Sequence, residues 1–416
     1  MIKVWSILTT RLNHRFLGCN LLFQALDDKE YCVGIYLDGK MIYDHIPPNL
    51  TKTWSYSSFL QDKGIEFAQI YTKGKTLKEI CPPQHQEEFD LAWKKMQAFY
   101  KSFTIAKIDL NQNCFFDLLP EQFVKDFCEV KNKITQHVFE TYQRPDNYEL
   151  QQKIVSITTE ISNQRLNVNL EPLKESYENP RTREFFKRFK AASPYVNYNP
   201  FGTKTGRLTT KRNSFPILTM DKRFRNVLQP NNDMFVELDY NAAELRVLIG
   251  LLGMPQPDED IHDWNIKNLY EGSIGREQAK KNIFSWLYNP NSKDKALDKH
   301  YDRKKVMNEY WDGKFVKNYY KREIESDEYH SLNYIIQSTC SDLIMDRAFL
   351  IKEALQDLKS NIAFIIHDSI VLDLDKEDLS VINMLVKEFS STPFGTFKVN
   401  VSAGKNFGEM KELCIQ

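Results

Sequence analysis

Apolar runs separated by short polar turns predict strands in the C-terminal half of the chain. Phe364 to Ile366 is one such run and Ile370 to Leu372 is another, with His367, Asp368 and Ser369 between them. Short apolar runs with polar boundaries are typical of buried strands. Residues 363–375 therefore predict a tight hairpin with an acid at its turn. Turn chemistry alone is one explanation of that acid, because Asp and Ser are common in turns.

Apolar residues spaced by three and four predict helices elsewhere. Leu150, Ile154, Ile157 and Ile161 would share one face of a helix that starts near residue 148. Similar patterns predict helices over 116–142, 181–192, 273–290 and 331–355, and a strand followed by a helix over 234–253. Residues 1 to about 110 are predicted to mix short strands with turns, and 144–148 to form a linker. The irregular alternation of strands and helices predicts an α+β (mixed α/β) fold.

Length and composition narrow the class of protein. A chain of 416 residues is too long for one compact core, so two or three domains are expected. Lys and Arg together equal Asp and Glu, at 56 each, so a polyanion partner would need a local basic patch. Seven scattered cysteines without a C-x-x-C pair favour a reduced, cytoplasmic setting. No apolar run is long enough to span a bilayer, and no membrane partner is expected.

Two acids are candidates for metal chemistry. Asp239 follows the predicted strand 234–238 and precedes a helix, where an N-cap role is the simplest interpretation. Asp368 is the turn acid. Considered together, they suggest two carboxylates at strand ends of one sheet. Such a pair suits Mg²⁺, which prefers oxygen ligands and shares them with phosphates.

A basic and aromatic stripe lies on the predicted helix 273–290. Arg276, Lys280, Phe284 and Tyr288 are spaced by four residues and so share one winding stripe. The cations could hold phosphates and the rings could stack on a base. A solvated basic face beside core aromatics explains the same spacing.

Several motifs together resemble family A (DNA polymerase I-like) DNA polymerases of bacteriophage type, from about residue 148 to the C-terminus. DYNAAELR (239–246) is similar to motif A, the stripe from Arg276 to Tyr288 to motif B, and HDS (367–369) to motif C, which is usually H-D-E. TGRL (205–208), DIH (260–262), NYIIQST (333–339) and GKNFGEMKEL (404–413) resemble further segments of these enzymes, in the same order along the chain.

The resemblance implies roles for individual residues. Asp239 and Asp368 would be catalytic and bind two Mg²⁺ ions, with the carbonyl of Tyr240 as a further ligand. Arg276, Lys280 and His262 would bind the incoming triphosphate, Phe284 would lie by the sugar, Tyr288 at the templating position, and Glu244 would exclude a ribose 2′-OH. Arg207, Gln337 and Asn333 would contact the minor groove, and His367 the primer terminus.

Four positions depart from the family pattern. Asn241 and Ala242 replace the usual Ser-Gln of motif A. Ser369 replaces the usual Glu of motif C, which removes one charge near the metals. Asn289 follows Tyr288 where Gly is usual. Both aspartates are present, so activity is expected to survive.

The implied domains are a polymerase domain at 148–416 and a separate domain at 1–147. Residues 148–204 would form the palm entry and a reduced thumb, 205–260 and 331–416 the palm, and 261–330 the fingers. The basic helix 181–192, with Arg181, Arg183, Lys187 and Arg188, could bind DNA phosphates or be an ordinary surface helix.

The first 147 residues are interpreted as a degenerate 3′–5′ exonuclease-like domain. Its helix motif would be DFCEVKN (126–132), with Phe127 for the usual Tyr and Lys131 for the Asp that binds metal. Asp28-Lys29-Glu30 spells the strand motif D-x-E but lies in a polar, turn-like cluster. An unrelated accessory domain is the alternative.

The implied activity is DNA-directed DNA synthesis in phage replication, without proofreading. Its partners would be primer–template DNA, dNTPs and a processivity or replication protein, in the bacterial host cytoplasm. A single-subunit RNA polymerase is one alternative, although Glu244 would serve it no purpose. A non-catalytic subunit that binds primer–template is the other, although it would not need both Asp239 and Asp368.

Overall fold

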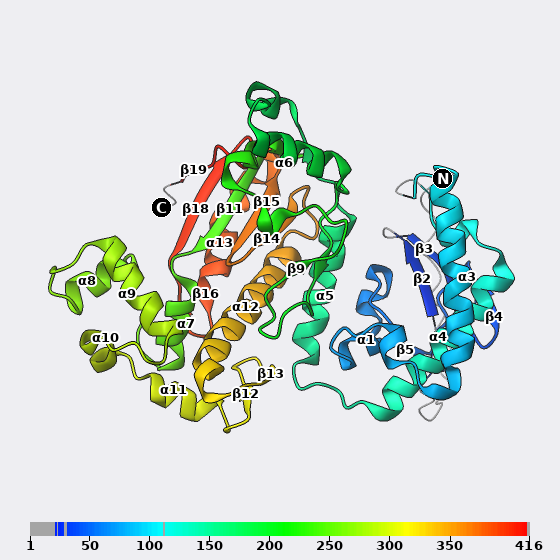
Figure 1. Ribbon diagram of the computed structural model, residues 1–416, viewed down its shortest axis with the longest axis horizontal. Helices are drawn as coiled ribbons and strands as arrows, with labels where there is room; N and C mark the ends of the chain where they lie inside the picture. The colour runs from blue at the N-terminus through cyan, green and yellow to red at the C-terminus, as the bar shows by residue number, and fades with distance from the viewer. Residues whose placement is uncertain (1–20, 23, 29–30, 111–112, 414–416) are drawn as a thin grey trace. The chain divides into compact units, whose positions relative to one another are not determined.

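The computed structural model describes residues 21–22, 24–28, 31–110 and 113–413 of the chain, which form two compact units (Figure 1). Unit 1 comprises residues up to Ser55, Phe59–Ala68 and Leu77–Thr141. Unit 2 comprises Tyr56–Ser58, Gln69–Thr76 and the chain from Tyr142 onward. Each unit has its own hydrophobic core.

Unit 1 contains two small sets of paired strands. β2 (Gln24–Asp28), β3 (Tyr31–Leu37) and β4 (Lys40–Ile42) form an antiparallel meander. β1 (Leu21–Leu22), β5 (Leu50–Thr53) and β6 (Glu66–Phe67) pair in parallel. These strands agree with the strand-like runs predicted for this part of the sequence.

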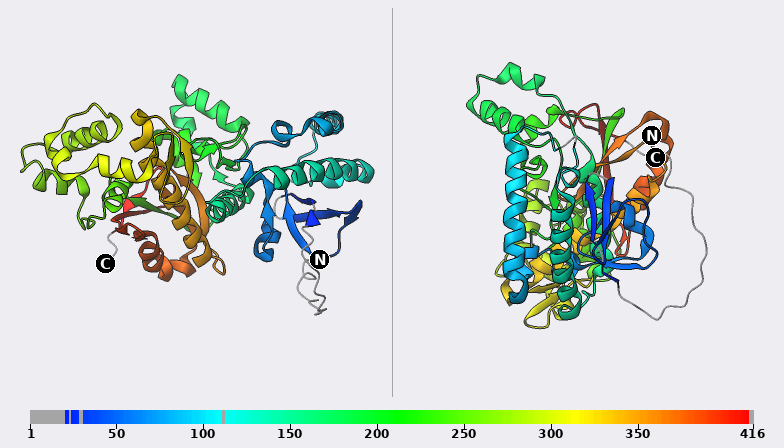
Figure 2. Two further views of the ribbon diagram at one scale, coloured as in Figure 1. Left: turned by 90° about the horizontal axis from the view of Figure 1, so that it is seen from below. Right: turned by 90° about the vertical axis from the view of Figure 1, so that its right-hand side faces the viewer.

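Two long helices of unit 1 correct the sequence interpretation. α3 (Gln86–Ile105) is a helix of 20 residues where only strands and turns were predicted. Its buried Phe89, Ala92 and Met96 recur at three and four residues, which is the helical signal that was overlooked. α3 lies beside α4 (Glu121–Thr141), as Figure 2 shows. α4 begins five residues later than predicted, because Pro120 keeps the preceding Leu119 extended.

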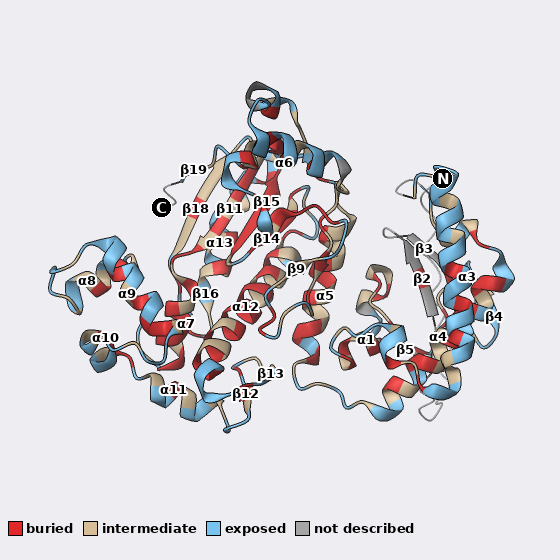
Figure 3. Cartoon of the chain, viewed as in Figure 1, coloured by how far each residue is buried: buried red, intermediate tan, exposed pale blue. Residues whose placement is uncertain are grey.

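Unit 2 is built around an antiparallel sheet of five strands in the order β14-β15-β11-β18-β19. Its strands are β11 (Met234–Tyr240), β14 (Asn361–Ile366), β15 (Ser369–Leu374), β18 (Val399–Gly404) and β19 (Lys411–Glu412). β14 and β15 are buried along nearly their whole length (Figure 3). Their apolar runs thus form the two strands of the predicted hairpin.

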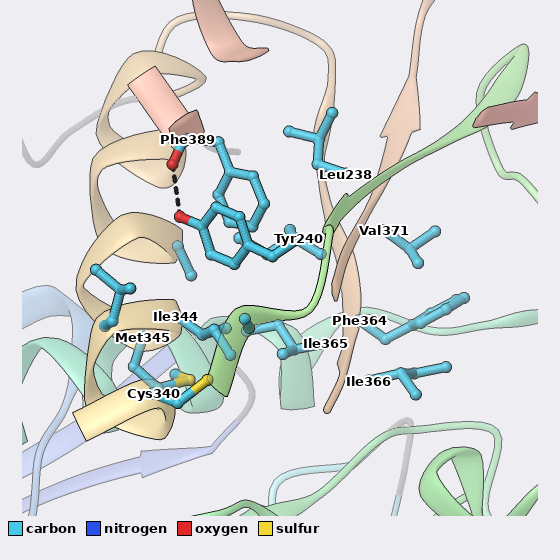
Figure 4. Close-up of a cluster of buried hydrophobic side chains, with 14 of the residues drawn as sticks. Leu238, Tyr240, Cys340, Ile344, Met345, Phe364, Ile365, Ile366, Val371 and Phe389 are labelled. Carbon is cyan, nitrogen blue, oxygen red and sulfur yellow. Dashed lines mark hydrogen bonds between the residues drawn. The ribbon is translucent and has the colours of Figure 1, made fainter. Parts of the chain in front are cut away.

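The long helix α12 (Glu328–Ala354) packs against β14 and against α5 (Tyr148–Asn163), α7 (Ala243–Leu251) and α13 (Ile382–Ser390). α5 buries the four residues predicted to share its inner face. Tyr240 stacks on Phe389 with ring centroids 4.1 Å apart and donates a hydrogen bond to its carbonyl (Figure 4). Leu238 and Tyr240 thus point into the core, so Glu237 and Asp239 emerge on the other face of β11.

The remaining α-helices and strands complete the two units. The helices are α1 (Ala68–Tyr71), α2 (Leu77–Ile80), α6 (Pro180–Ala191), α8 (Ile261–Asn268), α9 (Arg276–Tyr288), α10 (Lys295–His300) and α11 (Arg303–Tyr310). The strands are β7 (Asn167–Val168), β8 (Tyr198–Asn199), β9 (Thr209–Thr210), β10 (Leu228–Gln229), β12 (Phe315–Lys317), β13 (Glu323–Glu325), β16 (Ser391–Thr392) and β17 (Gly395–Thr396). The fold is mixed α/β, as predicted.

Within the residues that the structure describes, no helix combines the length and apolar character that a membrane span requires.

Candidate active site

Asp239 and Asp368 come from neighbouring strands of the unit 2 sheet. Asp239 is the penultimate residue of β11, and Asp368 lies in the turn between β14 and β15. The register pairs Asp239 with Ser369, the residue after Asp368. Two acids far apart in sequence therefore lie at one end of one sheet.

The hairpin turn holds Asp368 in a constrained backbone. His367 has a φ of 53°, a conformation that costs a non-glycine residue free energy and that often occurs at functional sites. The Ser369 hydroxyl lies 3.1 Å from the carbonyl of Ile366, across the turn, and 3.0 Å from Oε1 of Glu237, so these two acceptors share its one proton. Ala242, after Asp239 in motif A, also has a positive φ, of 51°.

Both aspartates are difficult to ionise without a cation. Burial, together with the charges of Asp368 and Glu237, raises the pKa of Asp239 to about 7, although Asn400 and Lys222 oppose the shift. Burial also raises the pKa of Asp368, although Arg207 opposes it. A cation between these groups would relieve both penalties.

The donor set fits Mg²⁺ shared with a substrate phosphate. In the described part of the chain, no three His, Cys, Asp or Glu side chains meet closely enough to ligate one ion. Mg²⁺ in phosphate-handling enzymes usually takes only one or two carboxylates and completes its shell with water and phosphate oxygens. Two carboxylates at strand ends meet that requirement.

α9 carries the predicted stripe of cations and rings. Arg276 begins the helix, Lys280 is exposed one turn later, and Tyr288 ends it. The rings of Phe284 and Tyr288 stack with centroids 6.0 Å apart. Asn289 ends the helix in an extended conformation, and its side chain accepts a hydrogen bond from the Asn291 N–H.

Asp260 connects α9 to the β11–α7 segment, and the sequence analysis gave it no role. One of its oxygens accepts hydrogen bonds of 2.8 Å from both Arg276 and the Asn241 amide, and the other caps α8. Burial alone would raise the pKa of Asp260, but these hydrogen bonds hold it well below its usual range. Asn241, one of the residues that differ from the resembled motif, thus positions the acid that holds Arg276.

Buried Arg246 fixes the same region. It donates to the carbonyls of Asn241, Pro257 and Glu259 at 2.8 to 2.9 Å. Arg246 therefore stabilises the chain between α7 and α8.

His262 lies beside the two cations of α9. Burial, reinforced by Arg276 and Lys280 and opposed by Asp260, lowers the pKa of His262. The ring is 4% exposed, and its Nδ1 has no hydrogen-bond partner within the described residues. An unpaired buried nitrogen is costly, so a ligand proton or donor would be favoured there.

A cleft of about 390 Å³ brings many of the predicted site residues together. Those that line it are Arg207, Glu244, His262, Phe284, Tyr288, His367 and Asp368. Asp239, Tyr240, Arg276, Lys280, Asn333 and Gln337 are not among its lining residues.

Arg207 and Glu244 form an ion pair at this cleft. Burial raises the pKa of Glu244, although Arg207 opposes the shift. Gln337 accepts a hydrogen bond of 2.7 Å from Thr205, in the same loop as Arg207. Asn333 lies one turn before Gln337 on α12, and its Oδ1 is buried without a hydrogen-bond partner among the described residues.

α6 is a basic amphipathic helix. Phe185 and Phe189 are buried against the core, whereas Arg181, Arg183, Lys187 and Arg188 are all exposed. Asn179 caps its start by accepting a hydrogen bond from the Arg181 N–H. Arg183 donates to the carbonyl of Glu178 and Arg188 to the Thr219 hydroxyl, and none of the four cations lines the cleft.

The candidate exonuclease residues of unit 1 lie partly outside the described residues. Asp28 ends β2, and Lys29 and Glu30 lie outside them. On α4, Phe127 and Cys128 are buried. Burial lowers the pKa of the neighbouring Lys131 to about 8.

The sequence matches no protein-family model and no curated protein. The fold is similar to a solved structure described as the POL domain of Pol1 from M. smegmatis in complex with DNA primer-template and dNTP. The TM-score is 0.63 at 11% identity, and the match covers 94% of this chain and 96% of that one. The chain thus has the fold of a polymerase POL domain.

Proposed function

We propose that the chain catalyses template-directed DNA synthesis by adding deoxynucleotides to a primer 3′ end. The observation that carries the proposal is the pair Asp239 and Asp368 at one end of a sheet, beside a cleft lined by the motif A and motif B residues Glu244 and Phe284. The polymerase fold supports it. The palm would comprise residues 205–260 and 331–416, and the fingers 261–330.

Asp239 and Asp368, with the carbonyl of Tyr240, would hold Mg²⁺. When bound, Mg²⁺ neutralises charge on the phosphates and on the attacking and leaving oxygens. The two carboxylates contribute by being fixed on a rigid sheet with raised pKa values, so that cation binding also relieves their burial.

α9 would bind the triphosphate of the incoming nucleotide. Arg276 is paired with Asp260, so phosphates must compete with that carboxylate for the guanidinium. Lys280 is exposed on the same stripe, and His262 presents an unpaired nitrogen within the described part of the chain. Phe284 and Tyr288 would contact the sugar and the templating position.

Glu244 would exclude the ribose 2′-OH, and its ion pair with Arg207 supports this role. Held by Arg207 beside the cleft, the carboxylate occupies a fixed position. This favours deoxynucleotides over the RNA polymerase alternative. Arg207 and Gln337, joined through the 205–207 loop, would contact the minor groove with Asn333, and His367 would lie at the primer terminus.

The reduced thumb within residues 148–204 and the first 147 residues are the parts of the chain from which we infer partners. Between α5 and Arg207, the longest helix is α6, with 12 residues, so we propose weak duplex binding and a processivity protein that supplements it. We also propose that residues 1–147 are a degenerate exonuclease-like domain, because Lys131 stands where an acidic ligand is expected.

Primer extension by the purified chain tests the proposal. With Mg²⁺ and a primer–template, dNTPs should be incorporated according to the template, and rNTPs should be poor substrates. Equal use of rNTPs would favour the RNA polymerase alternative. DNA binding without incorporation of either would favour the non-catalytic subunit.

A further inference from the structure

Glu237 shares a face of the sheet with Asp239. The two residues alternate with core-facing Leu238 on β11, so their side chains emerge on the same side. The register places Ser369 of β15 opposite Asp239, and Ser402 of β18 opposite Glu237. Glu237 is therefore part of the polar surface that carries the catalytic aspartate.

Two hydroxyl groups hold the Glu237 carboxylate. Ser369 donates to its Oε1 at 3.0 Å, and Ser402 donates to its Oε2 at 3.5 Å. Ser369 is only 3% exposed, so it holds one end of the carboxylate in a well-defined position. Arg207 and Arg276 pair with Glu244 and Asp260, and no ion pair of Glu237 with a Lys or Arg occurs among the described residues. Hydroxyl groups do not cancel the charge of Glu237. A partly buried carboxylate without a counterion favours a nearby cation.

Ser369 is also the residue that departs from motif C. The resembled enzymes carry a carboxylate there, directly after the second metal-binding aspartate. In this chain the position holds a hydroxyl that donates to a carboxylate on the adjacent strand. The charge missing from β15 is thus matched by a charge on β11.

We propose that Glu237 supplies the third carboxylate of the metal-binding site in place of the absent motif C glutamate. This inference rests on the proposed function. No three acidic side chains in the described ranges meet closely enough to ligate one ion, so Glu237 is a positioning residue. It would act through its charge on a cation held by Asp239 and Asp368.

The test separates charge from structure. Glu237→Gln removes the charge at nearly the same size and shape and keeps one of the two acceptor oxygens. Mn²⁺ binding is measured by titration calorimetry without DNA or nucleotide. We expect roughly 10- to 100-fold weaker Mn²⁺ binding, and a thermal unfolding midpoint of the metal-free protein that is not lowered, because the variant also removes repulsion between Glu237 and Asp239. Glu325→Gln, at an exposed carboxylate of β13, is the control and should bind Mn²⁺ as wild type does.

An exchange of the two side chains provides the rescue. Glu237→Ser should lose Mn²⁺ affinity, and adding Ser369→Glu should restore at least part of it, because the charge returns to β15. Three results would each overturn the inference. They are wild-type Mn²⁺ affinity in Glu237→Gln, no rescue by the exchange, and no Mn²⁺ binding by the wild-type protein. Mn²⁺ binding that depends on Glu237 in a protein without extension activity would support the inference and contradict the proposed function. Normal extension, together with Mn²⁺ binding that does not depend on Glu237, would support the proposed function and overturn the inference.

Discussion

Asp239→Asn should stabilise the metal-free protein while removing its metal-dependent stabilisation. In the folded chain the pKa of Asp239 is raised to about 7 from its ordinary 3.8. A group with a raised pKa retains its proton in the folded state at a pH where the unfolded chain has lost it. Stability therefore falls as the pH rises from about 4 to about 7, and the full cost remains at higher pH.

The magnitude follows from this shift. At 1.36 kcal/mol per pH unit, a rise from 3.8 to about 7 corresponds to a ceiling of about 4 kcal/mol. Asp239 is only partly buried, and water screens the repulsion from Asp368 and Glu237. We therefore expect Asp239→Asn to stabilise the protein by about 2 kcal/mol at about pH 8, and by less than about 1 kcal/mol at about pH 5.

Urea unfolding in the presence of EDTA measures this difference. Asp357→Asn, at an exposed carboxylate, is the matched control and should be neutral at both pH values. Added Mg²⁺ should stabilise the wild-type protein and have much less effect on Asp239→Asn, because ligands stabilise only the state that binds them. Destabilisation by Asp239→Asn at about pH 8, or a gain independent of pH, would refute the reasoning.

Three further predictions concern sugar discrimination, the first 147 residues and duplex binding. Glu244→Ala should increase ribonucleotide incorporation severalfold or more in single-nucleotide extension assays, because the carboxylate held by Arg207 is removed from the cleft. Unchanged sugar discrimination would mean that another residue excludes the ribose 2′-OH. The chain should not trim a mismatched primer 3′ end, because the proposed exonuclease-like motif has Lys131 where an acidic ligand is expected. Mg²⁺-dependent trimming that persists in an Asp239→Asn, Asp368→Asn double variant would mean that residues 1–147 form an active nuclease. Extension during a single encounter, measured with a trap for released enzyme, should give products of only a few nucleotides. DNA affinity should vary little with salt, since each phosphate contact contributes about −0.9 to the slope of log affinity against log salt concentration. Long products in moderate salt would disprove the weak duplex binding inferred from the short α6 region.

The elements that carry the site were predictable because their signals are local. The apolar runs around Asp368 form β14 and β15, and the strand before Asp239 forms β11. Their pairing in one sheet was predicted only from the chemistry that two such acids could perform. Alternation along β11 could also have indicated that Glu237 shares the face of Asp239.

Other features depend on contacts between distant residues. Asp260 meets Asn241 and Arg276 only because α8 and α9 fold back against the β11–α7 segment. No local pattern predicts that contact. In unit 1, the apolar spacing of α3 was present in the sequence, but bulky aromatic residues in it also suit strands.

The central claim is that Asp239 and Asp368 together support template-directed nucleotide addition. The most direct measurement is extension of a primer–template with dNTPs and Mg²⁺ by the wild-type chain, Asp239→Asn, Asp368→Asn and the control Asp357→Asn. We predict extension by the wild type and the control, and a loss of at least about a thousandfold in each of the other two, with DNA binding nearly unchanged. Near-normal extension by either Asp239→Asn or Asp368→Asn would contradict the account.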